Sequence, residues 1–275
     1  MAKDYELLDA GNGQRLERLD ELALIRPAPQ VSAPATRPEL WESWQVRYEP
    51  SDRRWHWRSP EKRQELRELR VQHAGLDFLA GLSPEGQIGF FPEQEPIWQE
   101  LRRQKLASTG GARLLNLFGH TGLASLAALQ AGFEVTQVDS SRGAMRRARA
   151  NVALSGQTDG VRWIEEDVRR FLNRELRRKS VYDSVVLDPP SFGRGTKGEV
   201  WKLERDLPVL LEVLGKLLRP GGQLLLSWHT TGMGPDRMGA MLTGVFPALE
   251  FRYVPLCVRA RSGAELAAGH LLIGV

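Results

Sequence analysis

From about residue 110 to the C-terminus, short apolar runs alternate with longer segments in which apolar residues recur at helical spacing. Strands are expected at residues 113–118, 133–138, 161–164, 181–187, 223–228, 250–257 and 269–275. Helices are expected at residues 123–131, 141–154, 168–177, 200–218 and 236–246. Strands that alternate with helices pack as a mostly parallel sheet with helices on both faces. This half of the chain is therefore predicted to be an α/β domain with a seven-stranded sheet.

The first part of the chain has a different pattern, in which short extended segments are separated by turn residues. Gly11-Asn12-Gly13 divides two such segments and predicts a β-hairpin. Four prolines between residues 27 and 38 predict an irregular connector, and two more strands are expected at residues 66–73 and 75–82. We therefore expect a small β-rich module at residues 1–85 and the α/β domain at residues 86–275.

Composition narrows the class of protein. The chain has 275 residues, of which 41% are hydrophobic, which is enough for a main domain and a smaller one. Its single cysteine, Cys257, excludes an internal disulfide, and the Cys and His spacing does not fit zinc, so no metal is expected. The N-terminus lacks a signal-peptide core, and no apolar run approaches the roughly 18 residues of a membrane span. These features predict a cytoplasmic protein without a membrane partner, and a net charge of +4 permits a nucleic-acid partner.

The most informative motif is Asp188-Pro189-Pro190-Ser191-Phe192, which directly follows the apolar run 181–187. Because proline has a fixed φ and no amide hydrogen, the strand stops there and no helix begins. The motif leaves a carboxylate and unpaired backbone carbonyls at the carboxyl end of a strand, where open α/β sheets bind ligands. An ordinary turn is the alternative interpretation if the motif is taken alone.

A second motif follows the first strand of the α/β domain, where Gly119 and Gly122 precede a helix. Glycines let a ligand approach the backbone, and a helix N-terminus presents free amides. The next strand ends at Asp139, about 20 residues after the first glycine, as expected for a carboxylate that binds ribose hydroxyls. A nicotinamide cofactor and S-adenosylmethionine both fit this pattern. The third glycine of a pyrophosphate loop is absent and His120 and Thr121 crowd the turn, which favours S-adenosylmethionine because it has no phosphates.

Asp167 lies at the end of the third strand of this domain. Its carboxylate could accept a hydrogen bond from an adenine amino group, or it could cap the helix expected at residues 168–177, and one residue can serve both ends. Asp139 has a similar alternative as a helix cap, next to Ser140 and Ser141.

In order and spacing, these motifs resemble those of class I S-adenosylmethionine-dependent methyltransferases. Within that class they are similar to the ribosomal RNA methyltransferases that include the 23S rRNA cytosine-C5 enzymes, which pair an Asn-Leu-Phe-x-x-Thr-Gly loop with an Asp-Pro-Pro-x-Phe strand end. The resemblance covers about residues 86–275 and includes the Arg-Pro-Gly-Gly turn at residues 219–222. It implies a Rossmann-like fold, S-adenosylmethionine as cofactor and ribosomal RNA as partner.

The resemblance also implies roles for particular residues. The segment 89–94 would form an entrance over the cofactor. Asp188, Pro189 and Phe192 would face the target base and carry the catalytic role. The residues implied to bind the cofactor are Asn116, Phe118, Gly119, Thr121, Gly122, Asp139, Ser140, Asp167 and Asp188.

One departure from that family changes the expected chemistry. Methylation at cytosine C5 needs a thiolate that attacks C6 of the ring. The family places this cysteine just after the fifth strand, where this chain has Thr230. We therefore expect transfer without a covalent adduct, as in the exocyclic-amine methyltransferases, which use a strand-end Asp, Asn or Ser followed by two prolines and an aromatic residue. Here Phe192 comes one residue later than in that motif.

Two other segments have features of an RNA contact. The glycine-rich, basic loop at residues 193–198 either closes over a substrate and contacts phosphate or is simply solvated. In the N-terminal module, aromatic and basic side chains are interleaved: Trp41, Trp44, Trp55 and Trp57 with Arg47, Arg53, Arg54 and Arg58. Such a pattern is typical of a surface that stacks bases and neutralises phosphates, although alternating aromatic residues in a strand also form cores. His229 is either a proton acceptor of the pocket or a satisfied loop histidine.

Three classes of function fit these observations. The first is a methyltransferase that uses S-adenosylmethionine to modify a base nitrogen of ribosomal RNA. The second is a nicotinamide-dependent oxidoreductase, against which the Asp-Pro-Pro motif and the missing third glycine argue. The third is an RNA-binding protein whose methyltransferase domain is catalytically silent. A small-molecule or protein acceptor is a further alternative for the enzyme.

Overall fold

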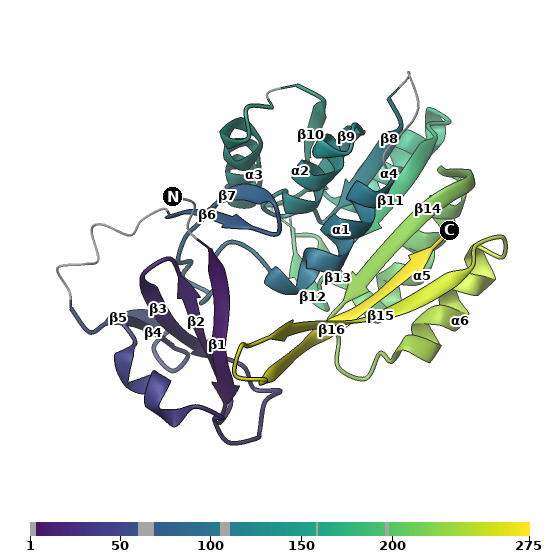
Figure 1. The fold of residues 1–275 in the computed structure, drawn as a ribbon. Helices are drawn as coiled ribbons and strands as arrows, with labels where there is room; N and C mark the ends of the chain where they lie inside the picture. The colour runs from purple at the N-terminus through teal and green to yellow at the C-terminus, as the bar shows by residue number, and fades with distance from the viewer. Residues whose placement is uncertain (1–3, 60–68, 105–110, 158, 196–197) are drawn as a thin grey trace. The chain divides into compact units, whose positions relative to one another are not determined.

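The computed structural model describes residues 4–59, 69–104, 111–157, 159–195 and 198–275 (Figure 1). Parts of the expected strand at 66–73 and of the loop at 193–198 lie outside these residues. The chain forms two compact units, Met1–Gln94 with Cys257–Ala268, and Glu95–Leu256 with Gly269–Val275. The first unit extends to Gln94 because the ring of Phe90 packs 5.2 Å from that of Tyr5 and 4.7 Å from that of Phe78.

The first unit contains a five-stranded sheet with the order β1-β2-β3-β4-β5. Neighbouring strands are antiparallel except β3 and β4, which are parallel. The hairpin predicted at Asn12-Gly13 joins β1 to β2. A second, two-stranded sheet is formed by β6 and β7, and the connector includes the short 3-10 helix η1. The bounds are β1 Tyr5–Gly11, β2 Gln14–Leu19, β3 Leu22–Pro27, η1 Pro38–Ser43, β4 Val46–Glu49, β5 Arg54–Trp57, β6 Leu69–His73, β7 Leu76–Ala80 and the 3-10 helix η3 Pro92–Gln94.

A charged cluster lies inside this unit. Glu17 on β2 and Arg26 on β3 are fully buried, and the Arg26 guanidinium donates to both carboxylate oxygens of Glu17, at 2.6 and 2.7 Å. The hydroxyl of Tyr5 donates to the same carboxylate at 2.9 Å. Since a buried charge is tolerated only when paired, these contacts hold β1, β2 and β3 in one register.

The second unit contains the seven-stranded sheet, whose order is β10-β9-β8-β11-β14-β16-β15. The first five of these strands are parallel to one another, whereas β16 is antiparallel to β14. The prediction of an α/β fold with a mostly parallel, seven-stranded sheet is therefore confirmed. The bounds are β8 Arg113–Leu117, β9 Glu134–Asp139, β10 Val161–Glu165, β11 Tyr182–Leu187, β14 Leu218–Trp228, β15 Phe251–Arg259 and β16 Glu265–Gly274.

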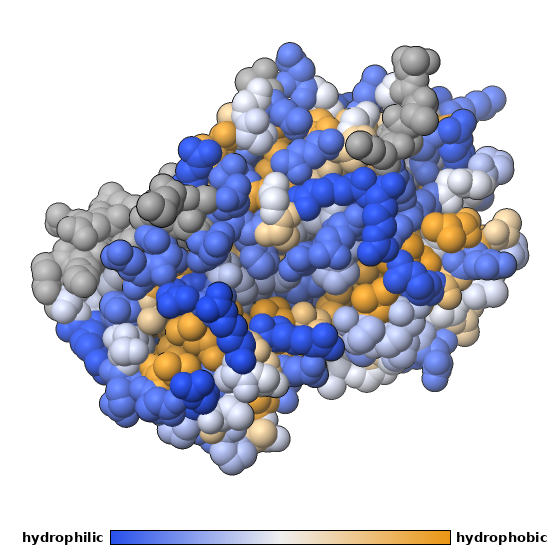
Figure 2. Space-filling view, in the orientation of Figure 1, coloured by the Kyte–Doolittle hydropathy of each residue, from blue (hydrophilic) through white to orange (hydrophobic). Residues whose placement is uncertain are grey.

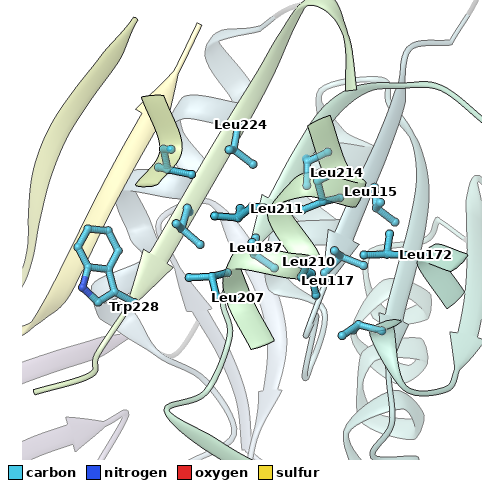
Figure 3. Close-up of a cluster of buried hydrophobic side chains, with 14 of the residues drawn as sticks. Leu115, Leu117, Leu172, Leu187, Leu207, Leu210, Leu211, Leu214, Leu224 and Trp228 are labelled. Carbon is cyan, nitrogen blue, oxygen red and sulfur yellow. The ribbon is translucent and has the colours of Figure 1, made fainter. Parts of the chain in front are cut away.

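Helices cover both faces of this sheet (Figure 1). On one face α1 contacts α2 and α2 contacts α3; on the other, α5 contacts both α4 and α6. Figure 3 shows the core on the second face, where leucines of α5 such as Leu207 and Leu211 meet Leu187 of β11 and Leu224 of β14. The bounds are α1 Glu95–Arg103, α2 Leu123–Gln130, α3 Arg142–Leu154, α4 Val168–Arg177, α5 Leu203–Gly215 and α6 Pro235–Val245.

Two local predictions were wrong, and one helix was missed. The helix expected at residues 200–218 is shorter, because Val200–Lys202 forms a strand, β13, that pairs with β12 at Phe192–Arg194. The Arg-Pro-Gly-Gly segment at residues 219–222 lies within β14 instead of ending a helix. The helix α1 was not predicted at all, although Ile97, Trp98 and Leu101 give it an apolar face.

Most of the molecular face drawn in Figure 2 is hydrophilic, and its hydrophobic residues lie in separate patches. In the part of the chain that the structure describes, the large hydrophobic side chains that are exposed are Val181, Phe192, Val209, Tyr253 and Val275. Among the described residues, no helix is both long and apolar enough to cross a membrane.

Candidate active site

The predicted site residues of the α/β unit lie at one edge of its sheet, because the register aligns the carboxyl ends of the parallel strands. Leu117 of β8 lies beside Leu187 of β11, and Glu165 of β10 lies beside Asp139 of β9. The chain continues from β8 to β9 on one side, whereas β11 lies on the other side of β8. Such a switch point in strand order is where open α/β sheets bind ligands. The residues at or just after these strand ends are Phe118, Asp139, Asp167, Asp188 and Ser227.

The loop after β8 has an unusual backbone conformation. Phe118 and His120 have φ angles of 55° and 44°, which non-glycine residues adopt rarely and often at functional sites. The Asp139 carboxylate holds the loop, because it accepts hydrogen bonds from the backbone amides of His120 (2.9 Å) and Ser141 (2.8 Å). Each oxygen keeps a lone pair that a ribose hydroxyl can use. Ser141, and not Ser140, caps α3, through a bond from the Ala144 amide.

The two glycines of this loop are required by packing within the protein. A Cβ atom at Gly119 would lie 2.7 Å from Cγ of Gln137 and 2.9 Å from Nδ2 of Asn116. Gly122 has a φ of 82°, and a Cβ there would lie 2.9 Å from that of Ala148. Glycine is therefore required at both positions because a larger side chain would clash with residues of β8, β9 and α3. The sequence pattern did not reveal this cause.

Replacing Gly119 by alanine is expected to shift the loop and to weaken binding of S-adenosylhomocysteine by about tenfold or more, since even a displacement of about 1 Å is costly at a site of this kind. Isothermal titration calorimetry measures the effect. The matched control is Gly143→Ala in α3, where a Cβ meets nothing within 4 Å. Equal affinities for the two variants would contradict this account of the loop.

Two predicted cofactor residues are buried. Asn116 is 2% exposed, and its side-chain amide donates to the hydroxyl of Ser125 in α2 at 2.9 Å. Thr121 is 5% exposed. Through its hydrogen bond to Ser125, Asn116 connects the end of β8 to the helix α2 that follows. The motif alone does not distinguish this positioning role from a contact with the cofactor.

Two further buried amides support the loop and were missed by the sequence analysis. Gln137 of β9 donates to the His120 carbonyl at 3.1 Å, and Asn151 of α3 donates to the Thr121 carbonyl at 2.8 Å. Both side chains are completely buried. No signal in the sequence singles out Gln137, because β9 also contains the polar residues Glu134 and Thr136.

Asp167 caps α4, as one of its two interpretations predicted. Its carboxylate accepts from the backbone amides of Arg169 (3.0 Å) and Arg170 (3.3 Å) and forms an ion pair with the Arg169 guanidinium at 2.8 Å. Burial alone would raise the pKa of Asp167, but the hydrogen bonds and charge of Arg169 lower it overall. Asp167 is therefore ionised at neutral pH and is able to accept a hydrogen bond from an adenine amino group. The contact with adenine itself remains a prediction.

Asp188 lies at the end of β11 and is partly exposed. Its Oδ1 accepts a hydrogen bond from the Ser227 hydroxyl at 2.6 Å and lies 3.6 Å from Nε2 of His229. Thr230, at the position where the resembling family has its cysteine, shares a hydrogen bond of 2.7 Å with the Ser191 hydroxyl. The site thus has a fixed carboxylate but a hydroxyl in place of a thiol.

The diproline corner is fixed from the other side by Trp201 on β13. Its indole N–H donates to the carbonyl of Pro190 at 2.7 Å, so that carbonyl is not free as the sequence motif implied. The same ring lies 4.9 Å from that of Phe118. Phe192 begins β12 and is 53% exposed. Pairing of β12 with β13 therefore holds an exposed aromatic ring four residues beyond Asp188.

His120 contributes a neutral imidazole to the site. Burial lowers the pKa of His120, and the negative charges of Asp139 and Asp188 oppose this only in part. His120 is therefore uncharged at neutral pH, so it adds no positive charge next to a sulfonium ligand. The sequence analysis treated this residue only as an obstacle to a phosphate.

The carboxylates at this edge of the sheet are hydrogen-bond acceptors that fit S-adenosylmethionine. Asp139 retains acceptor capacity for ribose hydroxyls, Asp167 is an ionised acceptor at the neighbouring strand end, and Asp188 places a carboxylate near the switch point. Among the residues described, no cluster of His, Cys, Asp and Glu could hold a metal ion.

The fold and this edge of the sheet define a class I methyltransferase domain. A family model for S-adenosylmethionine-dependent methyltransferases matches residues 13–254, so the chain belongs to that family. A crystal structure of the S-adenosylmethionine-dependent methyltransferase from Agrobacterium tumefaciens superposes with a TM-score of 0.91 and is 31% identical, over 100% of this chain and 91% of that one. The protein is thus an enzyme of the methyltransferase family, and its cofactor is S-adenosylmethionine.

Two other comparisons extend this result. A protein crystallised in complex with S-adenosylhomocysteine shares the fold, with a TM-score of 0.75 at 18% identity over 99% of this chain and 76% of that one. The ribosomal RNA large subunit methyltransferase K/L of Pseudomonas syringae pv. syringae is 32% identical over 161 residues, 58% of this chain and 20% of that protein. The same enzyme of Pseudomonas paraeruginosa is 34% identical over 58% of this chain and 21% of its own length. The chain therefore spans about a fifth of the curated relatives it matches.

Proposed function

We propose that this protein transfers a methyl group from S-adenosylmethionine to a base nitrogen of large-subunit ribosomal RNA. The observation that carries the proposal is the Asp188 carboxylate, which the Ser227 hydroxyl fixes at the switch point, four residues before the exposed Phe192. The similarity to enzymes named for the large ribosomal subunit RNA supports the choice of substrate. Because such a substrate is assembled where ribosomes are made, the proposal places the protein in the cytoplasm.

The chemistry follows from what these side chains can do. When bound, S-adenosylmethionine supplies an electrophilic methyl group on its sulfonium. Asp188 accepts a hydrogen bond from the target nitrogen, or from the amino group beside it, and thereby aims the nitrogen lone pair. The ring of Phe192 stacks on the base. Most of the acceleration comes from holding nitrogen and methyl in line at about 3 Å.

A covalent intermediate plays no part in this proposal. Thr230 has a hydroxyl where the cytosine-C5 enzymes have a thiol, and its Oγ1 shares a hydrogen bond with Ser191. A hydroxyl is a weak nucleophile at its ordinary pKa, and Ser191, which shares this hydrogen bond with Thr230, is not a base that could activate it. A nitrogen acceptor needs no such activation, because its lone pair attacks the methyl directly. The N–C bond forms as the S–C bond breaks, S-adenosylhomocysteine leaves, and Asp188 takes up the proton that the methylated nitrogen releases and passes it to water.

We further propose a division of labour along the chain, in which the β-rich N-terminal part serves substrate recognition and the α/β part serves catalysis. The proposed cofactor contacts are Phe118, Gly119, Gly122, Asp139, Ser140 and Asp167, with Asn116 and Thr121 supporting the loop. Asp188, Pro189 and Phe192 form the proposed contact with the base.

The proposal is tested with ribosomal RNA from a strain that lacks the gene. Purified protein and S-adenosylmethionine should add a methyl group to its large-subunit RNA, and mass spectrometry of nucleosides should identify a methylated base. Small-subunit RNA from the same strain is the matched control. If the protein binds S-adenosylhomocysteine but methylates no RNA, the proposal fails, and a silent RNA-binding protein or an enzyme with a small-molecule or protein acceptor takes its place.

A further inference from the structure

The structure separates the four tryptophans of the N-terminal unit into two pairs. The indole N–H of Trp41 donates to the carboxylate of Asp9 at 2.9 Å. That of Trp55 donates to the Ser83 carbonyl at 2.7 Å, and its ring packs 5.2 Å from that of Tyr48. These two side chains therefore hold the unit together, as alternating aromatic residues in a strand often do.

Trp44 and Trp57 have a different environment. Both are half-buried, and both line a hollow of about 140 Å³ beside the last strand of the five-stranded sheet. The backbone amide of Arg58 donates to the carbonyl of Gln45 at 2.9 Å, which keeps the two chain segments of the hollow together. The residues that line it are Ser43, Trp44, Gln45, Trp57, Arg58 and Ser59.

Two guanidinium groups lie over the Trp44 ring, that of Arg58 at 4.7 Å and that of Arg47 at 5.0 Å from its centroid. The Arg58 group is held further by a hydrogen bond of 2.5 Å to the Glu42 carbonyl. An arginine that stacks on an aromatic ring is ordered in advance and still presents N–H groups at its edge. Nε of Arg47 is buried and has no hydrogen-bond partner among the described residues, so this side chain has unused donor capacity.

We propose that the hollow lined by Trp44 and Trp57, together with the guanidinium groups of Arg47 and Arg58, binds an unpaired nucleotide of the RNA substrate, apart from the base that is methylated. The base stacks on the Trp57 ring, and the two guanidinium groups that lie over Trp44 pair with the flanking phosphates. The positive charge of these two groups is complementary to a phosphate backbone. This inference rests on the proposed function, since it takes the substrate to be RNA.

The test measures the affinity of the full-length protein for a short, fluorescently labelled oligouridylate by anisotropy. Trp57→Ala is expected to weaken binding about tenfold, because stacking of one base contributes about 1–3 kcal/mol. Trp57→Phe keeps an aromatic ring and should retain most of the affinity. The double variant Arg47→Gln/Arg58→Gln should lower the slope of log affinity against log salt by about one to two, as expected for two lost phosphate contacts.

The matched control for charge is Arg18→Gln/Arg70→Gln, which removes two arginines of the same unit that pair with Glu6 and Asp77. Binding of S-adenosylhomocysteine, measured by calorimetry, should be the same in all variants and shows that they fold. If Trp57→Ala and the Arg47/Arg58 variant bind oligouridylate as the wild type does, the inference is overturned. The proposed function is judged separately, by whether the wild type methylates ribosomal RNA.

Discussion

Replacing Asp188 by alanine is expected to reduce the rate of methyl transfer at least about a hundredfold and to weaken the binding of S-adenosylhomocysteine far less. The carboxylate is fixed by the Ser227 hydroxyl at 2.6 Å, so it is arranged before the substrate arrives. Removing one preorganised hydrogen-bonding group at a reacting centre typically costs a factor of about 10²–10³ in rate. Single-turnover kinetics on unmodified large-subunit RNA measures the loss.

Two further variants make this prediction specific. Ser227→Ala keeps the carboxylate but frees it to rotate, so we expect a smaller loss than for Asp188→Ala. Asp183→Asn, at the opposite end of the same strand β11, is the control for a change in charge and should leave turnover unchanged. Full activity of Asp188→Ala would show that this carboxylate does not orient the acceptor.

Replacing Glu17 by glutamine is expected to lower the free energy of unfolding by about 3–5 kcal/mol, because it leaves the Arg26 guanidinium charged and unpaired inside the protein. Denaturation in urea measures the change. Glu265→Gln is the matched control, since it removes only an exposed ion pair with Arg259 and should change the stability far less.

The buried ion pair of Glu17 and Arg26 also predicts that the stability of the protein depends on pH. Burial would raise the pKa of Glu17, but the charges of Arg26 and Arg15 lower it overall. A lowered pKa in the folded protein stabilises it above the unfolded value near 4.5, and this contribution disappears as the pH falls through the folded value. Glu17→Gln should therefore flatten the loss of stability below about pH 4.5. An unchanged acid-unfolding curve for Glu17→Gln would contradict this role of the ion pair. The double variant Glu17→Gln/Arg26→Gln removes both charges of the pair and should recover part of the lost stability.

The fold of the α/β unit could be predicted largely from local patterns. Apolar runs such as Leu114 to Leu117 are buried on both faces of a parallel sheet, and the helices between them carry one apolar face. The chain therefore specifies their type and order without knowledge of their packing. Elements that depend on a partner were missed: β13 exists because it pairs with β12, and α1 because its apolar face packs against α2.

The candidate site could be predicted only in outline. The motifs indicated which residues lie at strand ends, and register brought Asp139 and Asp188 to one edge of the sheet. They did not indicate which side chains support the others. Gln137 and Asn151 come from different elements and meet the loop only in three dimensions, so no spacing in the sequence reveals them.

By itself the sequence determined the class of fold, the cofactor family and the acids at the strand ends, because strand and helix periodicity and turn chemistry are local properties of the chain. Only the tertiary structure decided that Asn116 positions a helix, that Trp201 occupies the Pro190 carbonyl, and that Trp44 and Trp57 differ from Trp41 and Trp55. The physical reason is that a hydrogen bond or a stacked ring is defined by both of its partners, and these partners lie far apart in the chain.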